Sequence, residues 1–467
     1  MADGVSASEE RSSGEDLFTR AHAPYLVVVF LSEWLIASNS LVTATILPSV
    51  GASFSAYQWF GWVSAAFAVG IVTAAALSGV SAERLGLAKA MTFASALFAV
   101  GCMVAASANG IGVFIAGRAM QGLGAGWLGG LGYVVAAVCL PGRHLSRIFA
   151  ISAGIWGIAT IAGPLFGGIF ADAGFWPGVF VFFAAQAAVL ALLSACLFGT
   201  EAESAGAKSE ASIRALIPVV AGIVAIASAG VVAGVAAAIV LALSGLVALA
   251  LAVRLDQRAR TGLLPADLSR SLAGAGYVAY GATSAAGVAF SLYTPTILVT
   301  QYGLSAVEAG YVGVSDAVAW TIAAFVVSRA DEARRTTILI AGSVAIAVGV
   351  ILQAVVIGHG PLVAIVLAGA VMGAGFGSAR PVLGERLIRS LDAASRARGS
   401  GAITVMQSVG TALGAAVAGI AANAGDFESV GDRALTFAQG FGLFASTFPF
   451  ALVGIVAVVR FARLCHR

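Results

Sequence analysis

The feature of this sequence that most constrains its fold is a succession of about fourteen apolar stretches, each long enough to cross a lipid bilayer. At roughly 20 residues for each membrane-spanning helix, such stretches would take about 280 of the 467 positions. Only 10% of the residues are charged, against roughly 25% in soluble proteins. The sequence therefore predicts an all-α, polytopic membrane protein. This composition excludes a cytosolic enzyme, a nucleic-acid-binding protein and a receptor with a large soluble domain.

The predicted spans are 25–47, 58–78, 88–107, 111–139, 148–170, 179–198, 216–231, 234–253, 272–299, 306–328, 337–357, 361–383, 400–422 and 437–460. The stretch 216–253 is too long for one spanning helix, because at 1.5 Å per residue it would extend for about 57 Å. We expect two short spans that turn between Gly230 and Gly234.

The distribution of basic residues predicts the orientation of the chain. Arg433 lies in a predicted outer loop, and Arg118 and Arg380 lie within spans, so the other 22 of the 25 Lys and Arg residues fall on one side. The positive-inside rule places that side, and both termini, in the cytoplasm, which we expect to be that of a bacterial cell. The first 24 residues are acidic and rich in serine, unlike a basic secretory signal. We expect them to form a disordered cytoplasmic tail.

A glycine pattern recurs in the fourth and twelfth spans and indicates an internal duplication. The matching residues are Gly122, Gly124 and Gly126, and Gly373, Gly375 and Gly377. Each set lies in the fourth of six consecutive spans, which predicts two six-helix bundles with two inserted spans, a duplicated build typical of secondary transporters. The predicted parts are a tail (1–24), an N-terminal bundle (25–198), a linker (199–271) that contains the two extra spans (216–253), a C-terminal bundle (272–460) and a second tail (461–467).

A predicted loop after the second span combines a carboxylate with basic side chains. Its main residues are Gly79, Glu83, Arg84 and Gly86. Opposite charges beside two helix ends can form an ion lock that closes one face of a transporter. This segment resembles the signature loop of the major facilitator superfamily, with Glu83 in place of the usual aspartate. An ordinary charged loop is the alternative.

The fifth span has glycines three and four residues apart around a proline. They are Gly154, Gly157, Gly163, Pro164, Gly167 and Gly168. Such a stripe allows close helix contact, and the proline permits a bend. The pattern is similar to the motif that marks antiporters within the superfamily, which implies export rather than uptake. A generic glycine-rich packing face is the alternative.

The first span resembles that of the fourteen-span drug:proton antiporters, but Asn39 stands where the family has an aspartate. Asparagine cannot release a proton, whereas a carboxyl group among apolar side chains readily takes one up. We therefore predict that Glu33, six residues earlier, carries the coupling proton. Arg118 resembles the arginine of the superfamily's fourth-span motif. It lies at a similar depth, so we expect it to pair with Glu33; contact with lipid headgroups is the alternative.

Asp316 lies near the middle of the tenth span, where acidic residues usually have a function. It is the second candidate for proton coupling. For both acids the alternative is a hydrogen bond to a polar side chain on a neighbouring helix. Aromatic and amide side chains that can stack on flat lipophilic molecules are expected to line a substrate cavity. These are Trp34, Asn39, Gln121, Trp156, Tyr293 and Gln407.

The sequence thus predicts a monomeric secondary transporter, not an enzyme, that exports lipophilic or drug-like compounds in exchange for protons. The proton gradient supplies the energy, and we expect no metal or other cofactor and no partner besides substrate, protons and membrane lipids. One alternative is a dedicated exporter or importer of a single metabolite or lipid, not necessarily driven by protons. Another is a membrane scaffold or sensor that transports nothing.

Overall fold

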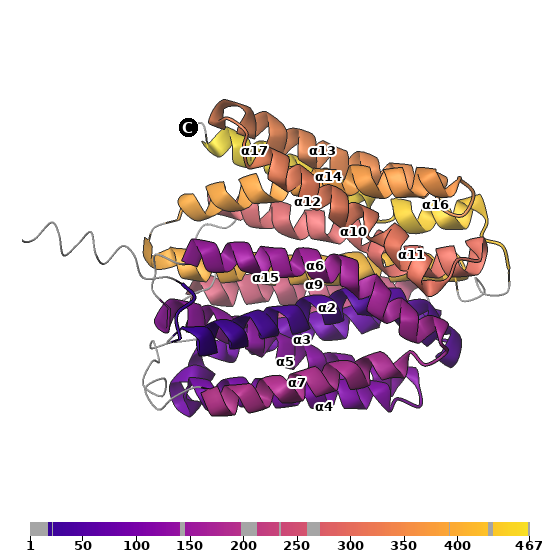
Figure 1. The fold of residues 1–467 in the computed structure, drawn as a ribbon. Helices are drawn as coiled ribbons and strands as arrows, with labels where there is room; N and C mark the ends of the chain where they lie inside the picture. The colour runs from indigo at the N-terminus through magenta and orange to yellow at the C-terminus, as the bar shows by residue number, and fades with distance from the viewer. Residues whose placement is uncertain are drawn as a thin grey trace, which may run out of the picture.

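The computed structural model describes residues 17–20, 22–140, 145–197, 213–232, 235–258, 271–391, 393–427 and 433–465. Within these ranges the chain is helical and contains no strand, so the all-α prediction is confirmed. The long helices run side by side across the molecule (Figure 1).

The helices fall into three consecutive groups along the chain. The first group is α2 (Ala23–Phe54), α3 (Phe60–Leu85), α4 (Leu87–Ala106), α5 (Ile111–Val138), α6 (Leu145–Asp172) and α7 (Pro177–Leu197). The second is α8 (Ile213–Ala229) and α9 (Val235–Arg258). The third is α10 (Leu272–Tyr302), α11 (Ala306–Gly313), α12 (Ser315–Val327), α13 (Glu332–Val356), α14 (Leu362–Arg389), α15 (Ala393–Ala424), α16 (Phe437–Ala445) and α17 (Phe448–Cys465).

Twelve helical segments of the described chain are long and apolar enough to cross a membrane. Two of them consist of consecutive α-helices, α11 with α12 and α16 with α17, and a third joins the 3-10 turn Tyr57–Trp59 to α3. Helix α5 and the shorter apolar helix α8 are not among the twelve, but α5 packs against α3 and α4, and α8 packs against α9. Each predicted span therefore contains a helix. The expected division of 216–253 is confirmed, because α8 and α9 are separate helices.

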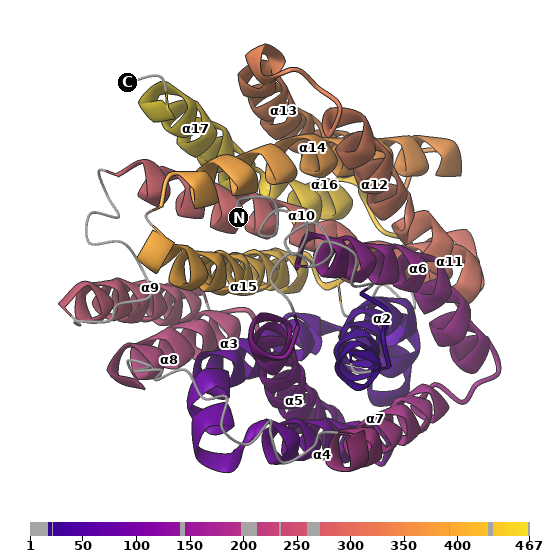
Figure 2. The same cartoon turned by 60° about the vertical axis from the view of Figure 1, so that its left-hand side comes forward.

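The first and third groups form two halves of the molecule. In Figure 1 the first half lies below and the second half lies above. Helix α8 packs on α9 and also contacts α3 of the first half and α15 of the second, as Figure 2 shows. The inserted pair therefore lies at the edge of the boundary between the halves. The exact domain bounds remain a prediction.

The glycine repeat has the same structural role in both halves, because it lets one helix lie directly on the backbone of another. A Cβ atom at the first and third glycine of each set would collide with backbone atoms of α3 in the first half and of α12 in the second, whereas the middle glycines, Gly124 and Gly375, face α4 and α13. The matching pairs are Gly122 with Phe67, Gly126 with Ile71, Gly373 with Asp316 and Gly377 with Trp320. The duplication inferred from the sequence is therefore visible in helix packing.

The segment predicted as a loop after the second span is mostly helical. Helix α3 continues to Leu85 and α4 begins at Leu87, so Gly86 alone separates them. Its φ of 79° is in the range that glycine adopts without a steric penalty. The loop prediction was wrong because the charged residues occupy the last turn of α3 rather than a connection.

We call the end of the molecule where α2 begins the N-terminal face, and the end where α2 finishes the opposite face. The last described helix, α17, returns to the N-terminal face, where the C-terminus is marked in Figure 1.

Candidate functional site

The two halves are joined at the opposite face by a carboxylate at the end of α6. Asp172 accepts hydrogen bonds from the backbone N–H groups of Ala306, at 2.7 Å, and Val307, at 3.3 Å. These are the first residues of α11, and the first N–H groups of a helix lack partners within it and carry partial positive charge. No sequence pattern singled out Asp172, because its partners are backbone groups about 134 residues away.

The glycines of the predicted antiporter stripe on α6 are closely packed in one part of the helix and unpacked in the other. Toward the opposite face a Cβ at Gly163 would lie 2.8 Å from the Cβ of Leu41 on α2, and Gly168 packs against Val307 of α11. Gly167 likewise packs against α2. By contrast, a Cβ at Gly154 or Gly157 would meet no atom within 4 Å. The expectation that Gly157 is closely packed is therefore wrong, because α6 contacts its neighbours tightly only beyond it.

Other contacts between the halves also lie toward the opposite face. Tyr293 of α10 is fully buried, with its ring centre 6.2 Å from that of Phe60 at the start of α3. A Cβ at Gly61 would lie 3.1 Å from the carbonyl oxygen of Ala415 on α15. The halves are thus closed against each other near the opposite face, while open space adjoins α6 nearer the N-terminal face.

Glu33 and Trp156, both predicted site residues, lie together on this open side. The indole Nε1 of Trp156 on α6 donates a hydrogen bond to Glu33 Oε2 on α2, at 3.0 Å. Glu33 is half-buried, and Trp156 is 40% exposed. The carboxylate is therefore held in the membrane-spanning part of the molecule with one side-chain partner and partial access to its surface.

Arg118 is buried in the first half and contacts amides rather than a carboxylate. Its Nη1 donates to Asn39 Oδ1 at 2.8 Å and to Gln121 Oε1 at 2.5 Å. The guanidinium carbon lies 4.2 Å from the centre of the Phe67 ring, within the range of a cation–π interaction. Arg118 is 3% exposed, and both amide side chains are fully buried.

The predicted pairing of Arg118 with Glu33 is wrong for a geometric reason. Glu33 and Asn39 are six residues apart on α2, so their side chains leave the helix about 120° apart at 3.6 residues per turn. Asn39 faces α5, where it meets Arg118, whereas Glu33 faces α6. Within the described chain Arg118 has no ion pair. The first half therefore holds a positive charge whose two hydrogen-bond acceptors are amides, which cannot exchange a proton.

In the second half Arg380 of α14 donates to Ser284 Oγ of α10 at 2.7 Å. Its guanidinium carbon lies 4.7 Å from the ring centre of Phe376 and 5.0 Å from that of Trp320. Asp316 stands in the first turn of α12 and is half-buried. In the part of the chain that the structure describes, Asp316 forms no ion pair with Arg380 or with any other cation.

The remaining predicted cavity residues divide by exposure. Trp34 is half-buried and donates from Nε1 to Gln186 Oε1 at 3.0 Å, and Gln407 is half-exposed. Asn39, Gln121 and Tyr293 are fully buried, so they do not line open space in this conformation.

Of the residues of the predicted ion lock, the structure describes the side chain of Arg84 but not that of Glu83. Arg84 is exposed. The surroundings of Gly79 and the side chain of Glu83 lie outside the described part of the chain, so the lock stays a prediction.

Comparisons with known proteins agree with this architecture. A sequence model of the Major Facilitator Superfamily matches residues 26–415. A probable multidrug-efflux transporter of Mycobacterium tuberculosis (strain ATCC 25618 / H37Rv) is 28% identical over 440 residues, which cover 91% of each chain.

Solved structures share the fold at low sequence identity. A D-xylose-proton symporter has a TM-score of 0.66 and 16% identity, covering 94% of this chain and 97% of its own. The nucleoside transporter NupG, as its D323A mutant, has a TM-score of 0.64 and 14% identity, covering 94% and 99%.

Proposed function

We propose that this chain, which belongs to the Major Facilitator Superfamily, exports lipophilic or drug-like compounds from a bacterial cell in exchange for protons. Its membership makes it a membrane transporter and not an enzyme. Export is supported by the similarity along most of the chain to a protein named as a probable multidrug-efflux transporter. The antiporter-like stripe of α6 gives independent support from the sequence.

The observation that carries proton coupling is the position of Glu33. Its carboxylate lies in the interior of a spanning helix and has Trp156 as its hydrogen-bond partner. It adjoins the part of α6 where Gly154 and Gly157 face open space. A carboxylate in such a place can lose its proton to water on the open side while the opposite face is closed.

Exchange follows if the two halves rock about this site. With the N-terminal face open, Glu33 loses its proton and substrate binds beside Trp156 and Trp34. The contacts of Asp172 and Tyr293 then separate, the opposite face opens, and a proton from outside protonates Glu33 and releases the substrate. Arg118 keeps a constant charge throughout this cycle, because a guanidinium group stays protonated, and its two amide acceptors cannot take up its proton.

The direction of export depends on orientation, which the charge distribution supports. Described arginines at the N-terminal face include Arg84, Arg254, Arg334 and Arg389, whereas Arg433 lies at the opposite face. We place the N-terminal face, with both termini, in the cytoplasm of a bacterial cell. In a variant without native cysteines, a new cysteine within 423–436 should react with an impermeant thiol reagent on whole cells. A cysteine at 205 should not, and its labelling from outside would reverse the orientation.

Reconstitution tests the exchange itself. Proteoliposomes that contain only this protein and a trapped pH indicator should change their internal pH when lipophilic dyes from a panel are added. Empty liposomes given the same dyes are the control, because weakly basic dyes cross lipid unaided. Dye transport without a pH change would favour the alternative of a transporter that protons do not drive, for which Asn39 beside Arg118 is the structural argument.

A further inference from the structure

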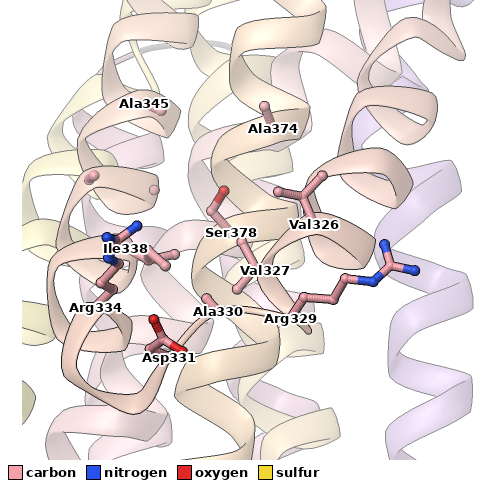
Figure 3. A pocket seen from close by; sticks show the side chains of 12 residues that line it. Val326, Val327, Arg329, Ala330, Asp331, Arg334, Ile338, Ala345, Ala374 and Ser378 are labelled. Carbon is pink, nitrogen blue, oxygen red and sulfur yellow. The ribbon is translucent and has the colours of Figure 1, made fainter.

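A groove lies at the N-terminal face of the second half, between α12, α13 and α14, away from Glu33. Its volume is about 550 Å³, within the range of small-molecule sites. Figure 3 shows Arg329 and Arg334 on opposite sides of it, with Asp331 between them and Ala345 and Ala374 at its far end. The groove therefore has one charged end and one apolar end.

The apolar end is formed by small or branched side chains in the membrane-spanning part of the helices. Its wall includes Val326 of α12, Ala345 of α13 and Ala374 of α14. The helix surfaces beside it are also apolar and exposed, since Val326 is 61% and Val344 is 42% exposed. Exposed apolar surface on a spanning helix contacts the hydrocarbon of the bilayer. A lipid chain can therefore enter the groove directly from the membrane.

The other arginines near this end of α13 and α14 are paired with acids. Arg335 contacts Glu332 at 3.2 Å and Glu385 at 2.6 Å. Arg386 contacts Glu332 at 2.8 Å, and Arg389 contacts Glu385 at 2.7 Å. Two carboxylates thus form ion pairs with three guanidinium groups.

Arg329 and Arg334, which flank the groove, have no such partner. Both are exposed, and neither forms an ion pair within the described chain. The guanidinium carbon of Arg329 lies 4.0 Å from the ring centre of Phe325, which leaves its N–H groups free to donate. Asp331 is the one acid that lines the groove, so its charged end carries a net positive charge.

We propose that this groove binds an anionic phospholipid from the leaflet at the N-terminal face. One acyl chain lies along Ala345 and Ala374, and the phosphate is held between Arg329 and Arg334. Arginine suits this task because its guanidinium donates two parallel hydrogen bonds to phosphate oxygens. The site is separate from Glu33 and does not depend on the proposed transport reaction.

Native mass spectrometry of the purified full chain tests this site with dioleoylphosphatidylglycerol and, for comparison, dioleoylphosphatidylcholine. Arg329→Gln and Arg334→Gln should each lower the affinity for phosphatidylglycerol by about fivefold and leave phosphatidylcholine unaffected. Arg389→Gln is the matched control, since it removes the same charge from the same face but does not line the groove. Equal phosphatidylglycerol binding by the double variant and by Arg389→Gln would overturn the proposal.

A second comparison separates a lipid from a free phosphate. Ala345→Leu fills the apolar end without changing any charge, and it should weaken phosphatidylglycerol binding while leaving the ion pairs intact. Ala345→Leu also tests the proposed site if the arginine variants do not purify as folded protein. Inorganic phosphate and glycerol 3-phosphate should raise the melting temperature of the unchanged protein less than phosphatidylglycerol does. An equal rise, or full lipid binding by Ala345→Leu, would contradict a lipid site.

Discussion

The helix pairs α3–α5 and α12–α14 share their backbone packing but differ in their polar side chains. In each pair, glycines of the second helix rest on the backbone of the first. The first contact is at Phe67 in one half and at Asp316 in the other. Phe67 lies beneath the buried Arg118, whereas Asp316 places a carboxyl group in the membrane. The duplication thus accounts for how the helices pack, and the charged groups differ between the halves.

The largest effect should come from breaking the shared packing. Gly122→Leu and Gly373→Leu would each force a side chain into the backbone of a neighbouring helix, and we expect each to destabilise the protein by more than about 3 kcal/mol. Gly112→Leu on α5, where a Cβ meets no atom within 4 Å, is the control. The yield of monodisperse protein and its thermal unfolding measure this. If one of the two variants behaved like the control, the halves would not be packed alike.

A smaller effect on stability should distinguish the surroundings of Arg118 from those of Arg380. Asn39→Ala removes an acceptor from the fully buried Arg118 and should destabilise the protein by about 1–3 kcal/mol, because water cannot replace the amide. Ser284→Ala removes an acceptor from Arg380, which is only half-buried, and should have an effect below about 1 kcal/mol. Denaturation of both variants in the same detergent compares them. Equal losses of unfolding free energy would mean that Arg118 and Arg380 are equally inaccessible to water.

The smallest effect should be on the contact between the halves. Asp172→Asn removes the charge that faces the start of α11, an interaction of about 0.3–1 kcal/mol, so the population with the opposite face open should rise about two- to fivefold. Spin labels at the exposed positions Phe175 and Phe437 can report this as a longer distance.

Glu308→Gln is the control for Asp172→Asn, because Glu308 caps α11 within its own half and glutamine keeps that capping bond. An unchanged distance distribution in Asp172→Asn would show that this contact does not hold the face closed.

Sequence reasoning located the helices because a run of apolar residues long enough to span a bilayer leaves little choice of structure. It found the duplicated glycines for a similar reason, since their spacing is visible in the chain. It ordered Glu33, Asn39 and Arg118 by depth alone and so paired the wrong two. The partner of Arg118 depends on rotation about the axis of α2, which depth does not determine.

Contacts between segments that are far apart in the sequence also could not be predicted. Asp172 binds backbone N–H groups of α11, which carry no residue-specific signal. The difference between Gly157 and Gly163 arises from where α6 touches α2, not from their spacing. Such features depend on how the two halves sit against each other in one conformation.

Proton coupling depends on Glu33, and transport driven by a pH gradient in proteoliposomes tests this role. Glu33→Gln should abolish accumulation of a dye that the unchanged protein transports, spare downhill exchange and remove its dependence on pH, because glutamine cannot exchange a proton. Asp316→Asn, the matching change in the other half, should still accumulate the dye. Accumulation by Glu33→Gln that collapses when the pH gradient is dissipated would contradict a coupling role for Glu33 and make Asp316 the next candidate.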